Sequence, residues 1–69
     1  MIQITCDHNP SCRIFLNGEL LIDQTLPYKN VLLSWSVGQT VREIVVKNTS
    51  KHQIVANGVK IRPGKTMSV

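Results

Sequence analysis

The sequence predicts an all-β protein, either a small antiparallel β-sandwich or a small barrel, formed by residues 1–69 as a single domain. Three observations lead to this prediction. Asn-Gly occurs twice, each time between two short apolar runs, and this dipeptide favours a type I′ hairpin turn because both central residues need a positive φ. Several segments alternate apolar and polar side chains with the period of a half-buried strand. Turns rich in Gly, Pro and Asn separate these segments, which is typical of sandwiches and barrels.

The N-terminal segment predicts a first strand with one buried face, because Ile2, Ile4 and Cys6 alternate with polar side chains. A turn is expected at residues 7–11, since the Asp, Asn and Ser side chains there can hydrogen-bond nearby backbone and the proline restricts φ. The chain should therefore reverse before its second strand begins.

A first hairpin is predicted around Asn17-Gly18, between residues 13–16 and 19–22. Both faces of this hairpin are mostly apolar. In a domain this small it is difficult to cover both sides of a sheet, so the outward face is a candidate protein interface; the alternative is that the whole hairpin belongs to the core. The outward residues, by simple alternation from the turn, are Phe15, Leu20 and Ile22.

The middle of the chain predicts one clear strand and one ambiguous segment. Residues 23–30 are expected to form a polar loop, and residues 31–37 alternate clearly enough to predict a strand with Trp35 in the core. The alternative for Trp35 is an exposed surface on which nucleic acid bases stack. Residues 40–43 have the spacing of a helix capping box, whereas the β-branched residues after them favour a strand. We expect a strand over residues 41–47.

The C-terminal part predicts a second hairpin and a last strand. Two short apolar runs flank Asn57-Gly58, and pairing outward from that turn places Ile54 opposite Ile61 and Ala56 opposite Val59 on the buried face. A final alternating run then reaches the C-terminus. The whole chain thus holds about seven short strands.

A motif in the C-terminal third consists of a strand ending in Asn-Thr-Ser, an apolar strand, Asn-Gly-Val, a short strand, Pro-Gly and a final alternating strand. It occupies residues 45–50, 57–59, 63–64 and 67–69. This motif resembles the closing strands of small immunoglobulin-like β-sandwich modules. The resemblance implies their fold, with loops or strand edges that bind other proteins, and it carries no catalytic residues. Residues 13–33 are also similar to the first motif of Sm-like RNA-binding proteins, although a glycine is missing from the second strand.

Charge is unevenly distributed along the chain. The first 43 residues hold all four acids and three bases, for a sum of −1, whereas the last 26 residues hold five bases and no acid. A basic half of this kind is suited to nucleic acid or to an acidic protein surface; the alternative is a strand edge protected by lysines against aggregation. The five candidate anion-binding residues are Lys47, Lys51, Lys60, Arg62 and Lys65.

Four residues have the chemistry of zinc ligands, namely Cys6, His8, Cys12 and His52. Their spacing matches no standard zinc finger, and the fourth ligand lies far along the chain. The alternatives are a Cys6–Cys12 disulfide, which would stabilise the fold by about 2–3 kcal/mol, and two free thiols. No carboxylate pair and no phosphate-binding glycine loop is present. We therefore expect no catalytic residues, no cofactor and no small-molecule substrate.

We expect a non-enzymatic protein that binds a protein partner or itself, or serves as a structural subunit. Chains of this size class are frequent among bacteriophage decoration, cement and tail components. The alternatives are a small basic nucleic-acid-binding domain and a small inhibitor of a host enzyme. No secretory signal and no apolar run of roughly 20 residues is visible, so we expect a cytoplasmic or virion-associated protein without membrane contact, and a chance glycosylation sequon at residues 48–50.

Overall fold

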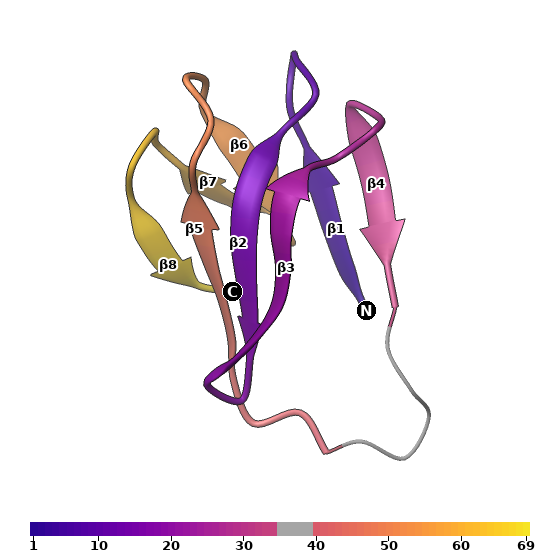
Figure 1. Ribbon diagram of the computed structural model, residues 1–69, viewed down its shortest axis with the longest axis vertical. Coiled ribbons are helices and arrows are strands. Elements are labelled where there is room, and N and C mark those ends of the chain that lie inside the picture. The colour runs from indigo at the N-terminus through magenta and orange to yellow at the C-terminus, as the bar shows by residue number, and fades with distance from the viewer. Residues whose placement is uncertain (35–39) are drawn as a thin grey trace.

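Eight antiparallel strands form two four-stranded sheets in the computed structural model, which describes residues 1–34 and 40–69 (Figure 1). No helix occurs in these two ranges. The all-β prediction is therefore confirmed, with eight strands in place of about seven. The strands are β1 (Ile2–Thr5), β2 (Ser11–Leu16), β3 (Glu19–Thr25), β4 (Asn30–Leu33), β5 (Ile44–Asn48), β6 (Ile54–Ala56), β7 (Val59–Ile61) and β8 (Thr66–Ser68).

The two sheets have the strand orders β4-β1-β6-β7 and β3-β2-β5-β8, and are called here the β1 sheet and the β2 sheet. Only β2–β3 and β6–β7 are consecutive strands within one sheet; every other pair of consecutive strands is divided between the two sheets. In Figure 1, β4 lies at one side of the molecule and β7 and β8 lie at the other, with β2 and β3 between them. The chain therefore holds the two layers together through its connections as well as through its core.

Both Asn-Gly turns have the backbone that the sequence predicts. The φ angles are 52° and 83° at Asn17 and Gly18, and 48° and 80° at Asn57 and Gly58. Positive φ at both central residues is the mark of a type I′ turn. In the second hairpin Ile54 pairs with Ile61, which confirms the predicted register.

The core lies between the two sheets, where alternate side chains of both layers meet. Val31 and Leu33 pack partly against it from β4, as the alternation in that segment predicts. Trp35 and the rest of the predicted strand after residue 34 lie outside the described residues. The buried apolar residues are Ile2, Ile4, Cys12, Ile14, Leu16, Leu26, Ile44, Val46, Ile54, Ala56 and Ile61.

The prediction that Ile22 faces outward is wrong, because β3 contains a bulge. Phe15 pairs with Leu20, but the next pair along is Ile14 with Ile22, so Leu21 is an extra residue on β3. A bulge of one residue reverses the face of every side chain beyond it. Ile22 consequently packs against the core, while Leu21 is 43% exposed.

Two segment boundaries also differ from the predictions. β3 continues to Thr25 because its last residues pair with the start of β2, so the expected loop over residues 23–30 is shorter, and Leu26 within it is buried. β5 begins at Ile44 in place of residue 41. Residues 41–43 precede the strand without regular structure, and the side chain of Asn17 in the neighbouring hairpin turn bonds the backbone N–H groups of Arg42 and Glu43.

Candidate functional site

An apolar row crosses the outer face of the β2 sheet. Leu20, Phe15 and Val45 are direct neighbours on three adjacent strands, because Phe15 pairs with both of the others. Leu20 is 55% exposed, and Phe15 and Val45 are half-buried. Cross-strand neighbours of this kind have Cβ atoms about 5 Å apart, so their side chains form one continuous surface. We call Leu20, Phe15 and Val45 the apolar row; the exposed Leu21 lies beside it at the bulge.

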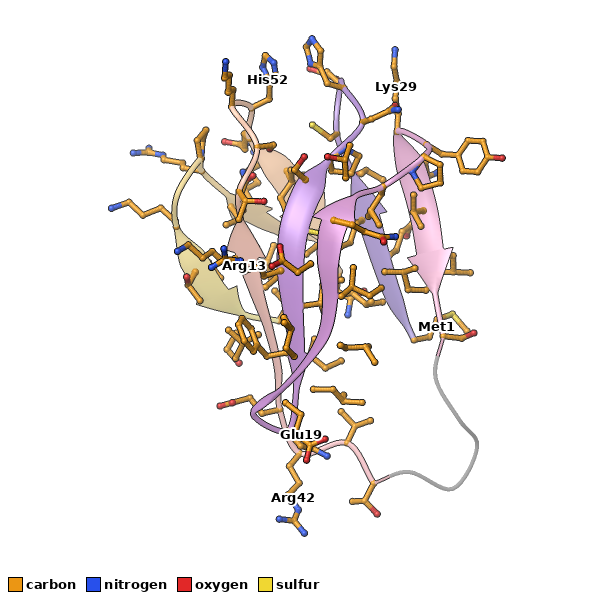
Figure 2. All side chains as sticks on the ribbon, viewed as in Figure 1. Met1, Arg13, Glu19, Lys29, Arg42 and His52 are labelled. Atoms are coloured by element: carbon orange, nitrogen blue, oxygen red, sulfur yellow. The ribbon has the colours of Figure 1, made fainter. Side chains whose placement is uncertain are left out.

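An ionic row lies next to the apolar row on the same face. Arg13 Nε lies 3.2 Å from Asp23 Oδ2, and both side chains are 45% exposed. Lys47 is the partner of Arg13 on β5. Beyond the apolar row, at the Asn17 end, Glu19 closes the hairpin and Glu43 precedes β5; Figure 2 shows Glu19 at that end of the molecule and Arg13 nearer its middle. Glu19 pairs with the buried Leu16, so it does not belong to the outer face, and Arg42, next to Glu43 in the chain, also lies at this end (Figure 2). Along the strands, the outer face thus changes from a mixed end with Glu43 and Arg42, through the apolar row, to the mainly basic ionic row.

The sequence predicted only part of this surface. Phe15 and Leu20 lie where alternation placed them, whereas Ile22 does not. Val45 was not recognised as a member, although its position between the buried Ile44 and Val46 is the signal that would have found it. Leu21 could not be found from the sequence, because a bulge depends on the partner strand.

The five predicted anion-binding residues all lie in the part of the chain from β5 onward. Most of them lie on or beside β7 and β8, which are edge strands of the two sheets. Lys47 pairs with Thr66 on β8. In the loop between β7 and β8, the N–H of Lys65 donates to Arg62 O at 3.1 Å, and Lys65 O accepts from the N–H of Asn48 at 2.9 Å. We call Lys47, Lys51, Lys60, Arg62 and Lys65 the basic edge.

Three of the four candidate zinc ligands come close together, in loops at the opposite end from Asn17. The imidazole rings of His8 and His52 are stacked, with centroids 3.7 Å apart and planes within 4° of parallel. Cys6 lines a cavity of about 340 Å³ together with Thr5, Asp7, His52, Gln53 and Val55. Cys12, by contrast, is fully buried in the core.

This arrangement is not a zinc site. The nitrogen lone pairs of an imidazole lie in the plane of its ring, so two parallel stacked rings do not direct them at one ion. Within residues 1–34 and 40–69, no group of three or more His, Cys, Asp or Glu side chains is placed to hold a metal ion. The predicted quartet therefore does not assemble.

The two cysteines are unpaired, so the Cys6–Cys12 disulfide does not form. The Cys6 thiol donates a hydrogen bond to Gln53 O at 3.4 Å and accepts one from the N–H of His8 at 3.5 Å. Burial, with a smaller contribution from the nearby charge of Asp23, raises the pKa of the Cys12 thiol to about 11. Cys12 is an apolar core residue in practice, while Cys6 is the accessible thiol.

Asn48 is the buried polar residue that the sequence analysis missed. Its side chain is fully buried, and its Nδ2 donates to His52 O at 2.7 Å and to Ile61 O at 2.9 Å. Its Oδ1 accepts from the N–H and the hydroxyl of Ser50. Asn48 therefore has a structural role, because its amide joins β5 to β7 and to the loop before β6 and is buried in the folded protein.

The fold and this surface define the molecule as a small two-sheet all-β domain with a half-apolar outer face. In comparisons with protein families, with curated proteins and with solved structures, nothing matched this chain. Among the described residues, no helix has the length and the hydropathy to cross a membrane.

Proposed function

We propose that this protein is a non-enzymatic association domain, and that the outer face of its β2 sheet binds the same face of a second copy. The observation that carries this proposal is the apolar row, which extends in register over β3, β2 and β5. Sheets in proteins commonly pack face to face through such side chains. An exposed apolar surface on a small soluble domain is a frequent mark of a protein interface.

The charges around the apolar row favour a second copy as the partner. A two-fold axis that runs across the strands through this row reverses the strand direction, so it places the Asn17 end of one copy, where Glu43 precedes β5, opposite Arg13 and Lys47 of the other. Such an isologous interface is self-complementary in charge and in apolar surface. The same axis leaves β8 of the two copies on one side of the contact, because β8 is the edge strand beside β5 in this sheet. The basic residues at that edge, with a net charge of +4 on each chain, therefore oppose association.

The association is expected to be weak. Full burial of a leucine or phenylalanine side chain contributes about 1.5–3 kcal/mol, and association costs at least about 4 kcal/mol in lost translational and rotational freedom. With principal extents of 33 × 20 × 20 Å, one face of this domain offers a contact at the low end of specific interfaces, below about 1,200 Å² in total. We expect a dissociation constant in the micromolar range or above.

Within this proposal the protein acts as a subunit or accessory of a larger assembly. The predicted resemblance to immunoglobulin-like modules and the size class shared with bacteriophage virion accessory proteins suit that role, and both stay predictions. The apolar row and the ionic row act in this proposal by binding alone, and none of their residues acts as a catalyst.

The test is sedimentation equilibrium at several protein concentrations with Leu20→Glu and a matched control, Leu32→Glu. Leu32 lies on β4 in the other sheet, is 63% exposed, and its substitution changes the net charge by the same amount. We expect the wild type and Leu32→Glu to self-associate equally, and Leu20→Glu to stay monomeric to at least tenfold higher concentration. Equal association of all three proteins, or a monomeric wild type at millimolar concentration, would overturn the proposal.

Thermal unfolding of the same three proteins keeps this result interpretable. Both substitutions are at exposed positions, so each should change the free energy of unfolding by no more than about 0.5 kcal/mol. If Leu20→Glu unfolds the monomer, the apolar row belongs to the fold of one chain and the proposed interface is wrong.

A further inference from the structure

The basic edge is a second surface with a different chemistry, and its composition follows from the fold. Lys60 is on the edge strand β7, Arg62 and Lys65 flank the loop to the other edge strand β8, and Lys47 is beside β8 on β5. Figure 2 shows nitrogen-tipped side chains projecting from the β7–β8 side of the molecule. The two sheets thus combine, along one side, bases that are up to 18 residues apart in the sequence, from 47 to 65.

No Asp or Glu side chain belongs to β5, β7, β8 or the loop between β7 and β8 in the described part of the chain. Asp7 is in the loop before β2, Glu19 and Glu43 are at the Asn17 end, and Asp23 is held by Arg13 on the other edge of the β2 sheet. Salt bridges in the described ranges involve none of the five bases of the basic edge. Their charges are therefore available to an external anion.

The distribution of these charges indicates that the ligand of the basic edge is an extended polyanion. The bases come from a strand face, two loops and an edge strand, and they do not line the cavity beside Cys6 and His52, so they do not enclose a single small anion. Phe15 and Tyr28, the Phe and Tyr residues of the described ranges, belong to β2 and to the loop between β3 and β4, and the His8 and His52 rings stack on each other. Phosphates, and not bases, are therefore the groups that this edge can contact.

We propose that the basic edge binds the phosphate backbone of nucleic acid without reading its sequence. The repeated phosphates of a nucleic acid backbone can contact lysine and arginine side chains that lie on two strands and the loop at one side of the molecule, and each contact releases condensed counterions. An interaction of this type has a dissociation constant of about 10⁻⁴–10⁻⁶ M at physiological salt. It does not require the self-association proposed above, because every single chain carries the complete edge.

The test is fluorescence anisotropy with a labelled 20-base-pair duplex of arbitrary sequence, titrated between 20 and 200 mM salt. With four or five phosphate contacts, the logarithm of the binding constant should fall with the logarithm of salt concentration with a slope of about −4. Two duplexes of unrelated sequence should give the same constant within about threefold.

A pair of double variants separates a local surface from net charge. Lys60→Gln with Lys65→Gln and Lys29→Gln with Arg42→Gln both lower the net charge from +4 to +2, but only the first pair belongs to the basic edge. We expect the first variant to lose about two units of the salt slope and at least tenfold in affinity at low salt, and the second to lose less than threefold.

Three outcomes would overturn this proposal. The first is a wild-type slope shallower than about −1. The second is equal loss in the two double variants, which would assign binding to overall charge. The third is tighter binding of polyglutamate than of the duplex, which would identify an acidic protein surface as the partner. Retention of duplex binding by Leu20→Glu, whatever its state of association, shows that the two proposals stand or fall separately.

Discussion

Asn48 shows how one side chain can join several elements in a core otherwise made of aliphatic residues. All four hydrogen-bonding positions of its amide are used, and its backbone bonds the loop between β7 and β8 through Lys65 and Gly64. Buried polar groups of this kind are stabilising only while every partner is present. The sequence pattern shows Asn48 only at the end of a strand, and it does not reveal this role because the partners of Asn48, apart from Ser50 and His52, are 13 or more residues away.

The substitution Asn48→Asp tests this role with almost no change in shape. At pH 7 a carboxylate oxygen would face the carbonyl oxygens of His52 and Ile61 where an N–H group now donates. We expect the free energy of unfolding to fall by about 3 kcal/mol or more, measured by urea denaturation. Since the native state would favour the protonated acid, the pKa of the introduced carboxyl group should be raised on folding, and stability should recover as the pH is lowered.

Ser50→Ala is the matched control, because it removes one hydroxyl that bonds the same amide and leaves no group facing a like charge. Its cost should be about 1 kcal/mol and independent of pH. If Asn48→Asp costs no more than Ser50→Ala, the amide is not the junction that the structure indicates.

The two Asn-Gly hairpins have the same turn but different attachments. At Asn17, Nδ2 donates to Thr40 O at 2.7 Å, and Oδ1 accepts from the N–H groups of Arg42 at 2.7 Å and Glu43 at 3.1 Å. At Asn57, Oδ1 accepts from the N–H of Gln3 at 2.9 Å. Each asparagine therefore forms a turn and also attaches a distant segment, but the Asn17 side chain makes three hydrogen bonds to that segment and the Asn57 side chain makes one.

Asn17→Gly and Asn57→Gly separate the turn from the attachment, since glycine adopts the positive φ without a side chain. We expect Asn17→Gly to lower the free energy of unfolding by about 2–3 kcal/mol and Asn57→Gly by about 1 kcal/mol, in chemical denaturation. Hydrogen exchange at Arg42 and Glu43 should accelerate only in Asn17→Gly. Equal destabilisation by the two variants would show that the turns, and not the side-chain bonds, carry the effect.

How far the sequence predicts this fold depends on whether the signal is local. The turns and the alternation in β1 and β6 are local, and these predictions are confirmed. The bulge in β3 is set by its pairing with β2, so alternation alone gave Ile22 the wrong face. Cys12, Ile14 and Leu16 alternate along β2 and therefore lie on the same face of the strand. This alternation already indicates from the sequence that the Cys12 thiol belongs to the core and not to a metal site.

Across the described part of the molecule, three regions differ in chemistry: an apolar outer face, a basic edge that shares Lys47 with the ionic row of that face, and a core shared by both sheets. The apolar outer face is the proposed site of self-association, and the basic edge is the proposed site of nucleic acid binding. Neither proposal requires a cleft. The core has its own reporter, because Cys12 belongs to it with a fully buried side chain. Its reactivity should therefore follow the unfolding of the entire domain, since both sheets must separate to expose it.

Alkylation at pH 8 tests this expectation. In the folded protein we expect one thiol, Cys6, to react within minutes, and Cys12 to react at least 100-fold more slowly, with a free energy of exposure equal to that of global unfolding in urea.

The same thiol should make stability depend on pH. Because burial raises the pKa of Cys12 from 9.0 to about 11, the native state keeps the thiol proton at pH values where the unfolded chain has lost it. The contribution of this thiol to the free energy of unfolding should thus be fully present below pH 9.0, and it should be lost as the pH rises from 9.0 toward 11. Cys12→Val should remove that loss and Cys6→Ser should keep it, whereas equal reaction rates for the two native thiols would contradict the buried position of Cys12.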